Sequence, residues 1–380
     1  MDLNDYRKEI DSIDKELVGL FARRMNIAAD IAGYKRENNI PVLDPQRERE
    51  KLHQVGEMAG EKTGRYAELL YSHIFELSRT YQRELLNPDN HIKHTILDAV
   101  ENTDKMFPTH ALVACQGVEG AYSQLACDKL FKSPNIMYFS TFEGVFSAID
   151  KGLCRYGVLP LENSTAGSVN KIYDLMMKYD FSIVRSTRRK VDHSLLVNKG
   201  VKLEDIKEIF SHEQAISQCE SFLKTLRNVK ITPCANTAAA AKMVFESGRK
   251  DAAALSSRSC AELYDLQCLQ EAVQDQGNNH TRFICISKKC EIYPGADKTS
   301  IMMVLPHRPG ALNNVLSRFY SLGVNLNKLE SRPLPNSDFE FMFYFDLETS
   351  VYSEEFTQIF NDLDDICSRF KYLGSYTEVV

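Results

Sequence analysis

Gly157-Val-Leu-Pro-Leu-Glu-Asn-Ser-Thr-Ala-Gly-Ser-Val169 joins an apolar, strand-like stretch ending at Pro160 to a turn loosened by Gly167. A helix is predicted over 169–177. Between the two lies a cluster of uncharged donors, namely Asn163, Ser164, Thr165 and Ser168. Backbone N–H groups at a helix start, flanked by hydroxyl and amide groups, can hold a small anion. The alternative is a Ser or Thr N-cap in an ordinary strand-to-helix turn.

Outward from this segment, short apolar runs alternate with helical patterns. Strands are predicted at 111–115, 157–161, 194–197 and 252–256, with a helix at 237–247. This alternation predicts an α/β architecture for residues 109–288.

Residues 2–86 have helical periodicity and almost no strand signal. Leu3, Ile10, Leu17 and Ile31 follow the spacing of one long amphipathic helix. Asp44-Pro45 predicts the start of a second helix, and 66–86 a third. Residues 1–90 are therefore predicted to form an all-helical domain, followed by a polar linker at 91–108.

A second linker is predicted at 289–298. Beyond it the pattern is strand 299–305, helix 311–322, strand 325–331, strand 339–347, helix 354–370 and strand 373–379. This βαββαβ order predicts a ferredoxin-like α+β domain at 299–380. With 380 residues the chain is long enough for several domains.

The composition is 43% hydrophobic and 26% charged, as in soluble globular enzymes. A net charge of −6 argues against nucleic acid or an anionic membrane as partner. The N-terminus lacks a signal-peptide apolar region, and no run approaches a membrane span. The ten cysteines form no CxxC pair or zinc-type cluster. We therefore expect a cytoplasmic protein without metal or cofactor.

Four segments in the central region resemble prephenate dehydratase. They are Gln116–Ser123, Gly157–Val169, Ser211–Ala215 and Asn278–Phe283. The resemblance implies two α/β lobes, like those of periplasmic binding proteins, with the site in the cleft between them. The family's usual His-Cys-Leu-Leu appears as His193-Ser194-Leu195-Leu196, a departure that puts little in doubt.

The resemblance also implies site residues. Prephenate loses its ring carboxylate as CO2 and its ring hydroxyl as water, and Thr281 is the implied donor beside that hydroxyl. Threonine is a weak acid, so either proton transfer or hydrogen bonding alone remains open. His212 and His280 are the conventional acids, but the resemblance supports neither. The implied substrate-binding residues are Glu162, Asn163, Ser164, Thr165, Ser211, Gln214, Gln218, Arg282 and Phe283. For Glu162, a structural salt bridge is an equally good interpretation.

In the N-terminal helices, polar residues interrupt the apolar rows. Arg7, Arg24 and Lys35 lie on the row that contains Leu17, and a cation facing a bundle core needs an anion. The alternative is a set of edge residues with snorkelling stems. The pattern resembles an all-helical chorismate mutase. The resemblance implies catalytic Arg7, Arg24, Lys35, Glu48 and Gln82, and substrate-binding Asp44, Arg47 and Ser78.

Chorismate rearranges to prephenate in a pericyclic step, which needs neither nucleophile nor proton shuttle. Arg7 and Arg24 are expected to bind the substrate carboxylates, Arg47 to support them, Lys35 and Gln82 to bind the ether oxygen, and Glu48 the ring hydroxyl. Arg7 and Arg24 lie 17 residues apart, about 25 Å along a helix. We therefore expect Arg7 to reach each pocket from a second copy in an interlocked dimer.

Near the C-terminus, Pro309-Gly-Ala-Leu312 and Glu330-Ser-Arg-Pro333 resemble the phenylalanine-binding motifs of ACT regulatory domains. The alternative is a purely structural dimerisation domain. The resemblance implies L-phenylalanine as effector. The implied effector-binding residues are Gly310, Ala311, Leu312, Asn325, Glu330, Ser331 and Arg332.

Together these features predict a bifunctional enzyme of phenylalanine synthesis, a homodimer or larger homo-oligomer acting on chorismate and prephenate. One alternative is a dehydratase whose N-terminal helices are only a dimerisation arm. Another is a non-catalytic sensor of small carboxylates. A mutase–dehydrogenase fusion would require a GxGxxG nucleotide motif, which the sequence lacks.

Overall fold

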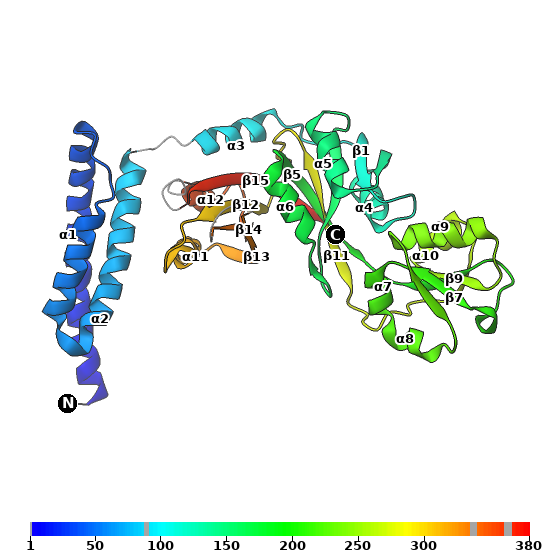
Figure 1. Cartoon of the computed structure of the whole chain (residues 1–380). Helices are drawn as coiled ribbons and strands as arrows, with labels where there is room; N and C mark the ends of the chain where they lie inside the picture. Colours follow the sequence, from blue (N-terminus) through cyan, green and yellow to red (C-terminus); the bar gives the residue numbers. More distant parts are fainter. Residues whose placement is uncertain (1, 87–90, 335–339, 361–366) are drawn as a thin grey trace. The chain divides into compact units, whose positions relative to one another are not determined.

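The computed structural model describes residues 2–86, 91–334, 340–360 and 367–380. The chain forms two compact units. Figure 1 colours the chain from the N-terminus in blue to the C-terminus in red. The first unit contains Met1–His94, Arg308–Gly323 and Glu354–Arg369, and the second contains Thr95–His307, Val324–Ser353 and Phe370–Val380. Each unit is considered by itself.

Two long helices begin the first unit. Helix α1 (Leu3–Glu37) starts with a capping box, in which the Asp2 carboxylate accepts from the N–H groups of Asn4 and Asp5 at 2.8 and 2.9 Å. Helix α2 (Pro45–Leu86) contains a break at Gly60, where φ is 74° and ψ is 173°. The second and third predicted helices are therefore the two parts of α2. The predicted start at Asp44-Pro45 is confirmed, and the Asp44 carboxylate accepts from the N–H of Arg47 at 3.0 Å.

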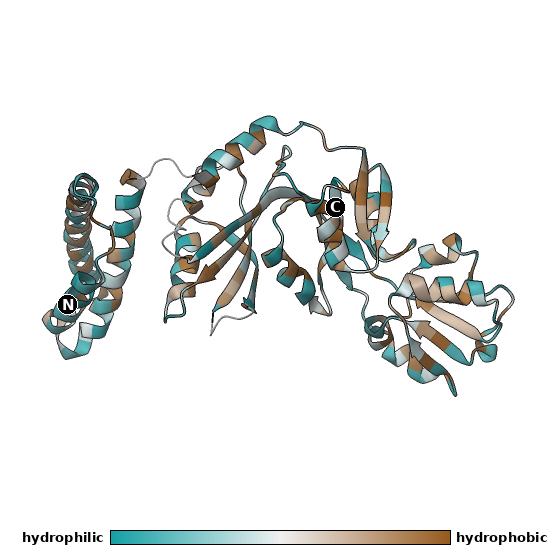
Figure 2. Ribbon diagram, turned by 45° about the horizontal axis from the view of Figure 1, so that its top comes forward, coloured by the Kyte–Doolittle hydropathy of each residue, from teal (hydrophilic) through white to brown (hydrophobic). Residues whose placement is uncertain are grey.

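The apolar row of α1 is largely uncovered. Only Ala28 and Ala32 of this helix are buried, whereas Leu3, Leu17 and Ile31 are 65%, 52% and 43% exposed. Both helices carry apolar and polar residues in Figure 2. Packing between α1 and α2 within one chain therefore leaves much of the apolar face of α1 in contact with water.

In the second unit, residues 110–190 and 280–287 form lobe 1. Its strands are β1 (His110–Gln116), β2 (Ser133–Phe139), β3 (Tyr156–Asn163), β5 (Ser182–Lys190) and β11 (His280–Ser287). Its helices are α4 (Tyr122–Leu130), α5 (Phe142–Asp150) and α6 (Asn170–Lys178). Strand β1 pairs in parallel with β2 and β3, and β11 lies antiparallel between β3 and β5.

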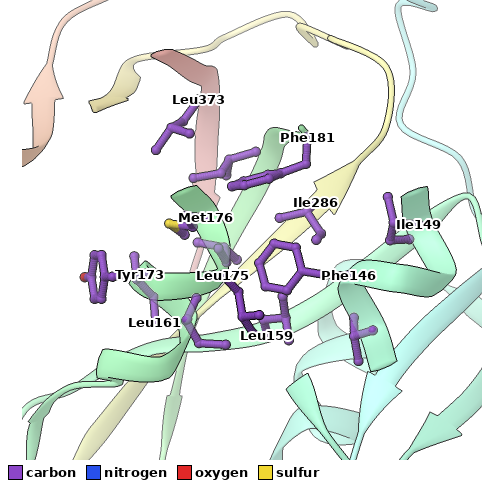
Figure 3. Close-up of a cluster of buried hydrophobic side chains, with 14 of the residues drawn as sticks. Phe146, Ile149, Leu159, Leu161, Tyr173, Leu175, Met176, Phe181, Ile286 and Leu373 are labelled. Carbon is purple, nitrogen blue, oxygen red and sulfur yellow. The ribbon is translucent and has the colours of Figure 1, made fainter. Parts of the chain in front are cut away.

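Large apolar side chains hold the helices of lobe 1 on the sheet. Phe146 of α5, Leu159 of β3 and Met176 of α6 are at most 1% exposed and belong to one core (Figure 3). Burying a side chain of this kind stabilises the fold by about 1.5–3 kcal/mol. This packing fixes the carboxyl end of β3, where the donor cluster begins.

Residues 194–270 form lobe 2. Its strands are β6 (Ser194–Val197), β7 (Glu208–Ser211), β8 (Lys230–Pro233), β9 (Ala252–Ser256) and β10 (Gln267–Gln270), in the order β10-β6-β9-β7-β8. Its helices are η1 (Leu203–Asp205), α7 (Glu213–Gln218), α8 (Glu220–Thr225), α9 (Thr237–Ser247) and α10 (Arg258–Leu263). The chain passes between the lobes twice, at 191–193 and at 271–279. The predicted two-lobed α/β architecture is confirmed.

The C-terminal segment has the predicted βαββαβ order. It comprises β12 (Lys298–Leu305), α11 (Ala311–Ser321), β13 (Asn325–Pro333), β14 (Phe341–Glu348), α12 (Glu354–Phe360) and β15 (Arg369–Val379). The strand order β13-β14-β12-β15 is that of a ferredoxin-like sheet.

Strand β15 also pairs in parallel with β5, so this sheet continues into lobe 1. Gly374 permits the join. Its φ is +134°, and a Cβ there would lie 2.3 Å from the carbonyl oxygen of Ile183.

Several local predictions differ from the structure. The predicted linker 91–108 contains helix α3 (His91–Asn102), because Ile96 and Ala99 at i, i+3 spacing are buried. Residues 369 and 370 belong to β15 rather than to a helix, while 361–366 and residue 339 lie outside the described residues.

The turn after β3 also differs from its prediction. Strand β3 continues past Pro160 to Asn163, and the chain turns back in β4 (Gly167–Ser168), which pairs with it. The following helix α6 has Val169 at its N-cap, without a side-chain cap. The donors therefore lie in a hairpin turn, and the Ser or Thr N-cap alternative is wrong.

Candidate active sites

Polar side chains meet between α1 and the two parts of α2. The guanidinium of Arg24 donates to the hydroxyl of Ser78, which is 5% exposed, and lies 5.4 Å from the ring centroid of Phe75. The ammonium of Lys35 donates to the carbonyl oxygen of Val42 at 2.6 Å. We call Arg24, Lys35, Glu48, Ser78, Arg79 and Gln82 the N-terminal polar cluster.

Two further members of the cluster are an amide, Gln82, and a carboxylate, Glu48. Gln82 is 7% exposed, and among the described residues its Oε1 has no hydrogen-bond partner. The carboxylate of Glu48 forms an ion pair with Arg79, which joins the two parts of α2. Arg79 was missed in the sequence, where an arginine on a long polar helix gives no distinguishing signal. Ser78 and Gln82 are buried, whereas Arg24 and Lys35 are half-buried and hydrogen-bonded.

Other residues expected near this cluster are exposed. Arg7 lies on α1, 17 positions before Arg24, and α1 is continuous between them. The side chains of Asp44 and Arg47 are exposed at the start of α2. The single chain therefore does not bring Arg7 to Arg24.

A cavity of about 520 Å³ lies between the two lobes of the second unit. Lobe 1 contributes Asn163, Thr281 and Phe283 to its wall, and lobe 2 contributes Gln214 and Gln218. Four of the segments singled out in the sequence therefore meet at one place: its wall also includes Gln116, Ser123, Ser168 and His212.

The described wall contains no Lys, Arg, Asp or Glu. Instead, the N-terminal ends of α4, α6, α7 and α9 reach it through Ala121, Val169, His212 and Asn236. Ala121 and Val169 cap their helices without a side-chain hydrogen bond. Because the positive ends of helix dipoles attract anions, the cavity suits negatively charged groups without a cationic side chain.

Four side chains close a ring of hydrogen bonds across the cleft, which we call the amide ring. Asn163 Nδ2 donates to Asn279 Oδ1 at 2.7 Å, and Asn279 Nδ2 donates to Gln218 Oε1 at 2.9 Å. Gln218 Nε2 donates to Thr165 Oγ1 at 2.8 Å, and Thr165 Oγ1 donates to Asn163 Oδ1 at 2.7 Å. All four bonds run in one direction, so the orientation of each amide fixes that of the next.

The ring determines the role of the Thr281 hydroxyl. Asn163 Oδ1 accepts from the N–H groups of Thr165 and Ala166 at 3.1 and 2.9 Å, which orients the amide with Nδ2 toward Thr281. Asn163 Nδ2 then donates to Thr281 Oγ1 at 2.9 Å. Since this bond uses a lone pair of Thr281, its hydroxyl proton is available for a ligand in the cavity.

Five residues expected to bind substrate lie outside the cavity wall, namely Glu162, Ser164, Thr165, Ser211 and Arg282. Thr165 belongs to the amide ring. The Ser211 hydroxyl is buried and donates to the carbonyl oxygen of Leu255 at 2.7 Å. Ser164 donates to the carbonyl oxygen of Asn278 at 2.8 Å. Glu162 precedes Asn163 and Arg282 follows Thr281 along paired strands, so both point to the opposite face of the sheet.

There they form a network with the C-terminal strands. Arg282, 4% exposed, forms ion pairs with Asp346 and, at 3.4 Å, with Glu162. Lys328 Nζ lies 2.7 Å from Glu162. Burial favours a raised pKa for Glu162, but the hydrogen bond and charge of Lys328, with Arg282, outweigh it and lower this pKa. The structural salt bridge is thus the better interpretation of Glu162, and direct substrate contact by either residue is not supported.

Asn279 and His193 are among the polar residues of the cavity region that were missed as site residues. Asn279 is 1% exposed and belongs to the amide ring, and His193 is 2% exposed and lines the cavity. Both lie on the crossings between the lobes. Only pairing of distant segments places them here, although the polar run at 278–281 marked the neighbourhood of Asn279.

The C-terminal motif residues divide between two elements. Gly310 is the N-cap of α11 with φ of 84°, and Ala311 and Leu312 begin that helix. Asn325, Glu330, Ser331 and Arg332 lie on β13. Glu330 accepts from the Ser168 hydroxyl of β4 at 2.5 Å, and Arg332 lies 3.1 Å from Asp174 of α6.

Family comparisons agree with this organisation. A model of chorismate mutase type II matches residues 6–83, and a model of prephenate dehydratase matches residues 113–291. A bifunctional chorismate mutase/prephenate dehydratase of Enterobacter agglomerans is 32% identical over 379 residues, covering 97% of this chain and 94% of the relative. The chain belongs to the family of bifunctional chorismate mutase/prephenate dehydratases.

Another bifunctional chorismate mutase/prephenate dehydratase, from Aquifex aeolicus (strain VF5), is 32% identical and covers 100% of this chain and 99% of the relative. A crystal structure of prephenate dehydratase in complex with L-Phe, from Arthrobacter aurescens, has a TM-score of 0.64 and 27% identity. It covers 70% of this chain, and the match spans 89% of that chain. The chain is thus an enzyme with a mutase domain and a dehydratase domain, as the sequence predicted. The dimerisation-arm and sensor alternatives lose their support.

Two observations bear on membranes and metals. No helix in the described part of the chain combines the length and apolar character needed to cross a membrane. Within the same residues, no three His, Cys, Asp or Glu side chains are grouped so as to hold a metal ion.

Proposed function

We propose that this chain acts in the cytoplasm and uses three regions in sequence: residues 1–90 for chorismate rearrangement, 109–288 for prephenate dehydration and 299–380 for sensing L-phenylalanine. The observation that carries the proposal is the Thr281 hydroxyl, which faces an uncharged cavity with its proton free. The same cavity suits a dianion that must lose hydroxide.

In the mutase domain, Arg24 binds one substrate carboxylate, with Ser78 holding its guanidinium in place. Lys35 and Gln82 donate to the ether oxygen as the C–O bond breaks and the new C–C bond forms. Glu48 accepts from the ring hydroxyl, and Arg79 orients it. Asp44 and Arg47 support the pocket from the start of α2.

The second carboxylate is bound by Arg7 of another chain. A straight α1 keeps Arg7 about 25 Å from Arg24 at about 1.5 Å per residue. The exposed apolar row of α1 offers a surface for the second copy. An interlocked dimer therefore both covers the apolar row of α1 and binds the second carboxylate of the substrate.

Complementation between two inactive variants tests this arrangement. Arg7→Ala and Arg24→Ala chains are each expected to lose most mutase activity. Co-expressed chains should recover about a quarter of it, because half of random dimers are hybrids and each hybrid keeps one intact site. Mutase rates on chorismate and the mass of the purified mixture measure this.

Arg23→Ala, at an exposed neighbouring position, is the matched control, and the dehydratase rate of each variant reports on folding. A mixture with no more mutase activity than its parents, despite hybrid dimers, would contradict a shared site.

In the dehydratase domain, prephenate lies in the cavity with its carboxylates toward the helix N-termini and the side chains of Gln214 and Gln218. The ring carboxylate leaves as CO2, and its bonding electrons aromatise the ring and expel the hydroxyl group. Thr281 donates a hydrogen bond to that oxygen as negative charge develops. Phe283 closes the apolar side, and Asn163 and Thr165 hold the donor through the amide ring.

In the C-terminal region, Gly310, Ala311 and Leu312 with Asn325 bind phenylalanine, and Glu330, Ser331 and Arg332 transmit the signal. Support comes from β13, whose Glu330 and Arg332 contact β4 and α6 at the edge of the dehydratase cavity. A change at β13 would therefore move the turn that carries Asn163 and Thr165.

Phenylalanine is expected to bind the chain and to reduce the dehydratase rate at subsaturating prephenate at least about fivefold, the lower range of allosteric coupling. Asp174→Asn, which weakens the contact with Arg332, should retain binding and lose much of the inhibition. Calorimetry and prephenate turnover measure the two effects.

Lys178→Ala is the matched control, since Lys178 lies on the same helix as Asp174 and its removal breaks an exposed ion pair with Glu143 of α5. Absence of both binding and inhibition in the unmodified chain would remove the proposed effector.

A further inference from the structure

His193 lies in the crossing between β5 and β6, beside the amide ring. Its Nε2 is 3.0 Å from Gln218 Oε1, and the imidazole is almost completely buried. Gln218 is the member of the ring that comes from lobe 2, whereas Asn163 and Thr165 come from lobe 1. His193 thus contacts the ring where the ring bridges the cleft.

The backbone of His193 is anchored on both sides. Its N–H donates to Gln274 Oε1 at 2.9 Å, and its carbonyl oxygen accepts from the N–H of Val273 at 2.8 Å. These bonds tie one crossing to the other. The ring of Tyr122 packs edge-on against the imidazole, with centroids 6.4 Å apart. The imidazole is therefore held in one position and not merely adjacent to Gln218.

The direction of the hydrogen bond between His193 and Gln218 follows from the amide ring. Gln218 Oε1 already accepts from Asn279 Nδ2, so His193 must donate through a protonated Nε2. Among the described residues, the other nitrogen, Nδ1, has no hydrogen-bond partner. Burial lowers the pKa of His193, although the hydrogen bond to Gln218 opposes this, so the neutral ring with its proton on Nε2 is favoured.

This donor reinforces the orientation of Gln218 that the other bonds of the amide ring favour. A Gln218 amide rotated by half a turn would place its NH2 against the NH2 of Asn279, donor against donor. It would also present its oxygen to Thr165, whose hydroxyl would then donate to Gln218 and no longer to Asn163 Oδ1. A fixed Nε2–H opposite Oε1 disfavours the rotated state, because that state would leave two buried donors facing one NH2 group.

We propose that His193 is a positioning residue of the dehydratase: it fixes the amide of Gln218, and through the amide ring it keeps Asn163 against Thr281 across the cleft. This inference rests on the proposed dehydratase function. His193 transfers no proton to substrate in this role. It acts only through Gln218.

Two substitutions at this position separate positioning from acid catalysis. His193→Gln retains a donor near the place of Nε2 but cannot act as an acid, whereas His193→Leu removes the donor. We expect His193→Leu to lower the dehydratase kcat about tenfold to hundredfold with a much smaller change in KM, as for a displaced catalytic group. His193→Gln should recover most of that loss.

A double-variant cycle tests the route through Gln218. Gln218→Met removes the amide at nearly constant volume. In that background, His193→Leu should cost no more than about twofold further, because the amide to which Nε2 donates is gone. The mutase rate of each variant and its thermal unfolding report on folding.

The outcomes are distinct. Equal losses for His193→Gln and His193→Leu would identify an acid and overturn the proposal, as would full activity of His193→Leu or additive losses in the double variant. If the unmodified chain failed to convert prephenate at all, the proposed function itself would fall, and that result is separable from the others.

Discussion

Replacing Thr281 with valine is expected to lower the dehydratase kcat by about 10²–10³-fold, the usual cost of losing one donor to a developing anion. Valine has nearly the shape of threonine and suits the strand, where Thr281 pairs with Asn163 and Arg189. The substitution therefore removes the hydroxyl with little change in packing. Prephenate turnover at saturating substrate measures the effect.

Thr281→Ser, which keeps the hydroxyl, is the matched control and should retain most activity. The mutase rate of both variants should be unchanged, because the N-terminal polar cluster contains no residue of the dehydratase domain. A valine variant that turns over prephenate normally, or that loses both activities together, would exclude Thr281 as the donor.

Replacing Asp346 with alanine is expected to destabilise the second unit by about 3–5 kcal/mol, the cost of leaving a buried charge without its partner. Asp346 is fully buried and accepts from Arg282, from Ser300 at 3.0 Å and from Tyr376 at 3.1 Å. Because Arg282 follows Thr281 in β11, dehydratase activity should be lost at lower denaturant concentration. Urea unfolding followed by circular dichroism and by prephenate turnover measures both.

The double variant Asp346→Leu with Arg282→Met should recover much of the stability, because an apolar pair can replace a buried ion pair. Asp180→Ala removes an exposed partner of Lys371 and should change stability by no more than about 0.5 kcal/mol. A loss below about 1 kcal/mol for Asp346→Ala would show that Glu162 and Glu378, at 3.4 and 3.7 Å, compensate Arg282.

The local sequence pattern predicted most of the helices and strands whose conformation depends on neighbouring residues alone. Strands β6 and β9 and helix α9 have the predicted bounds, because apolar runs and an Asn N-cap specify them within a few residues. Helix α3 was missed although five of its 12 residues are apolar, namely Ile92, Ile96, Leu97, Ala99 and Val100. Of these, Ile96 and Ala99 are buried in the structure.

Within the dehydratase site, the motif segments located the cavity but not the direction of each side chain. Adjacent residues on a strand face opposite sides, so Asn163 and Thr281 enter the cavity while Glu162 and Arg282 enter the C-terminal network. Ser211 has a suitable hydroxyl, yet the carbonyl oxygen of Leu255 uses it. Such competition for donors is invisible along the sequence.

The order of residues by itself determined the helical N-terminal region, the alternating α/β region and the βαββαβ segment, because each depends on periodicity among near neighbours. It also determined which side chains could carry the chemistry. Only the tertiary structure decided that β15 extends the sheet of lobe 1, that Arg79 pairs with Glu48, and that Asn279 and Gln218 join Asn163 in a ring. These contacts bring together residues far apart in the chain, and their geometry is set by strand register and core packing rather than by local preference.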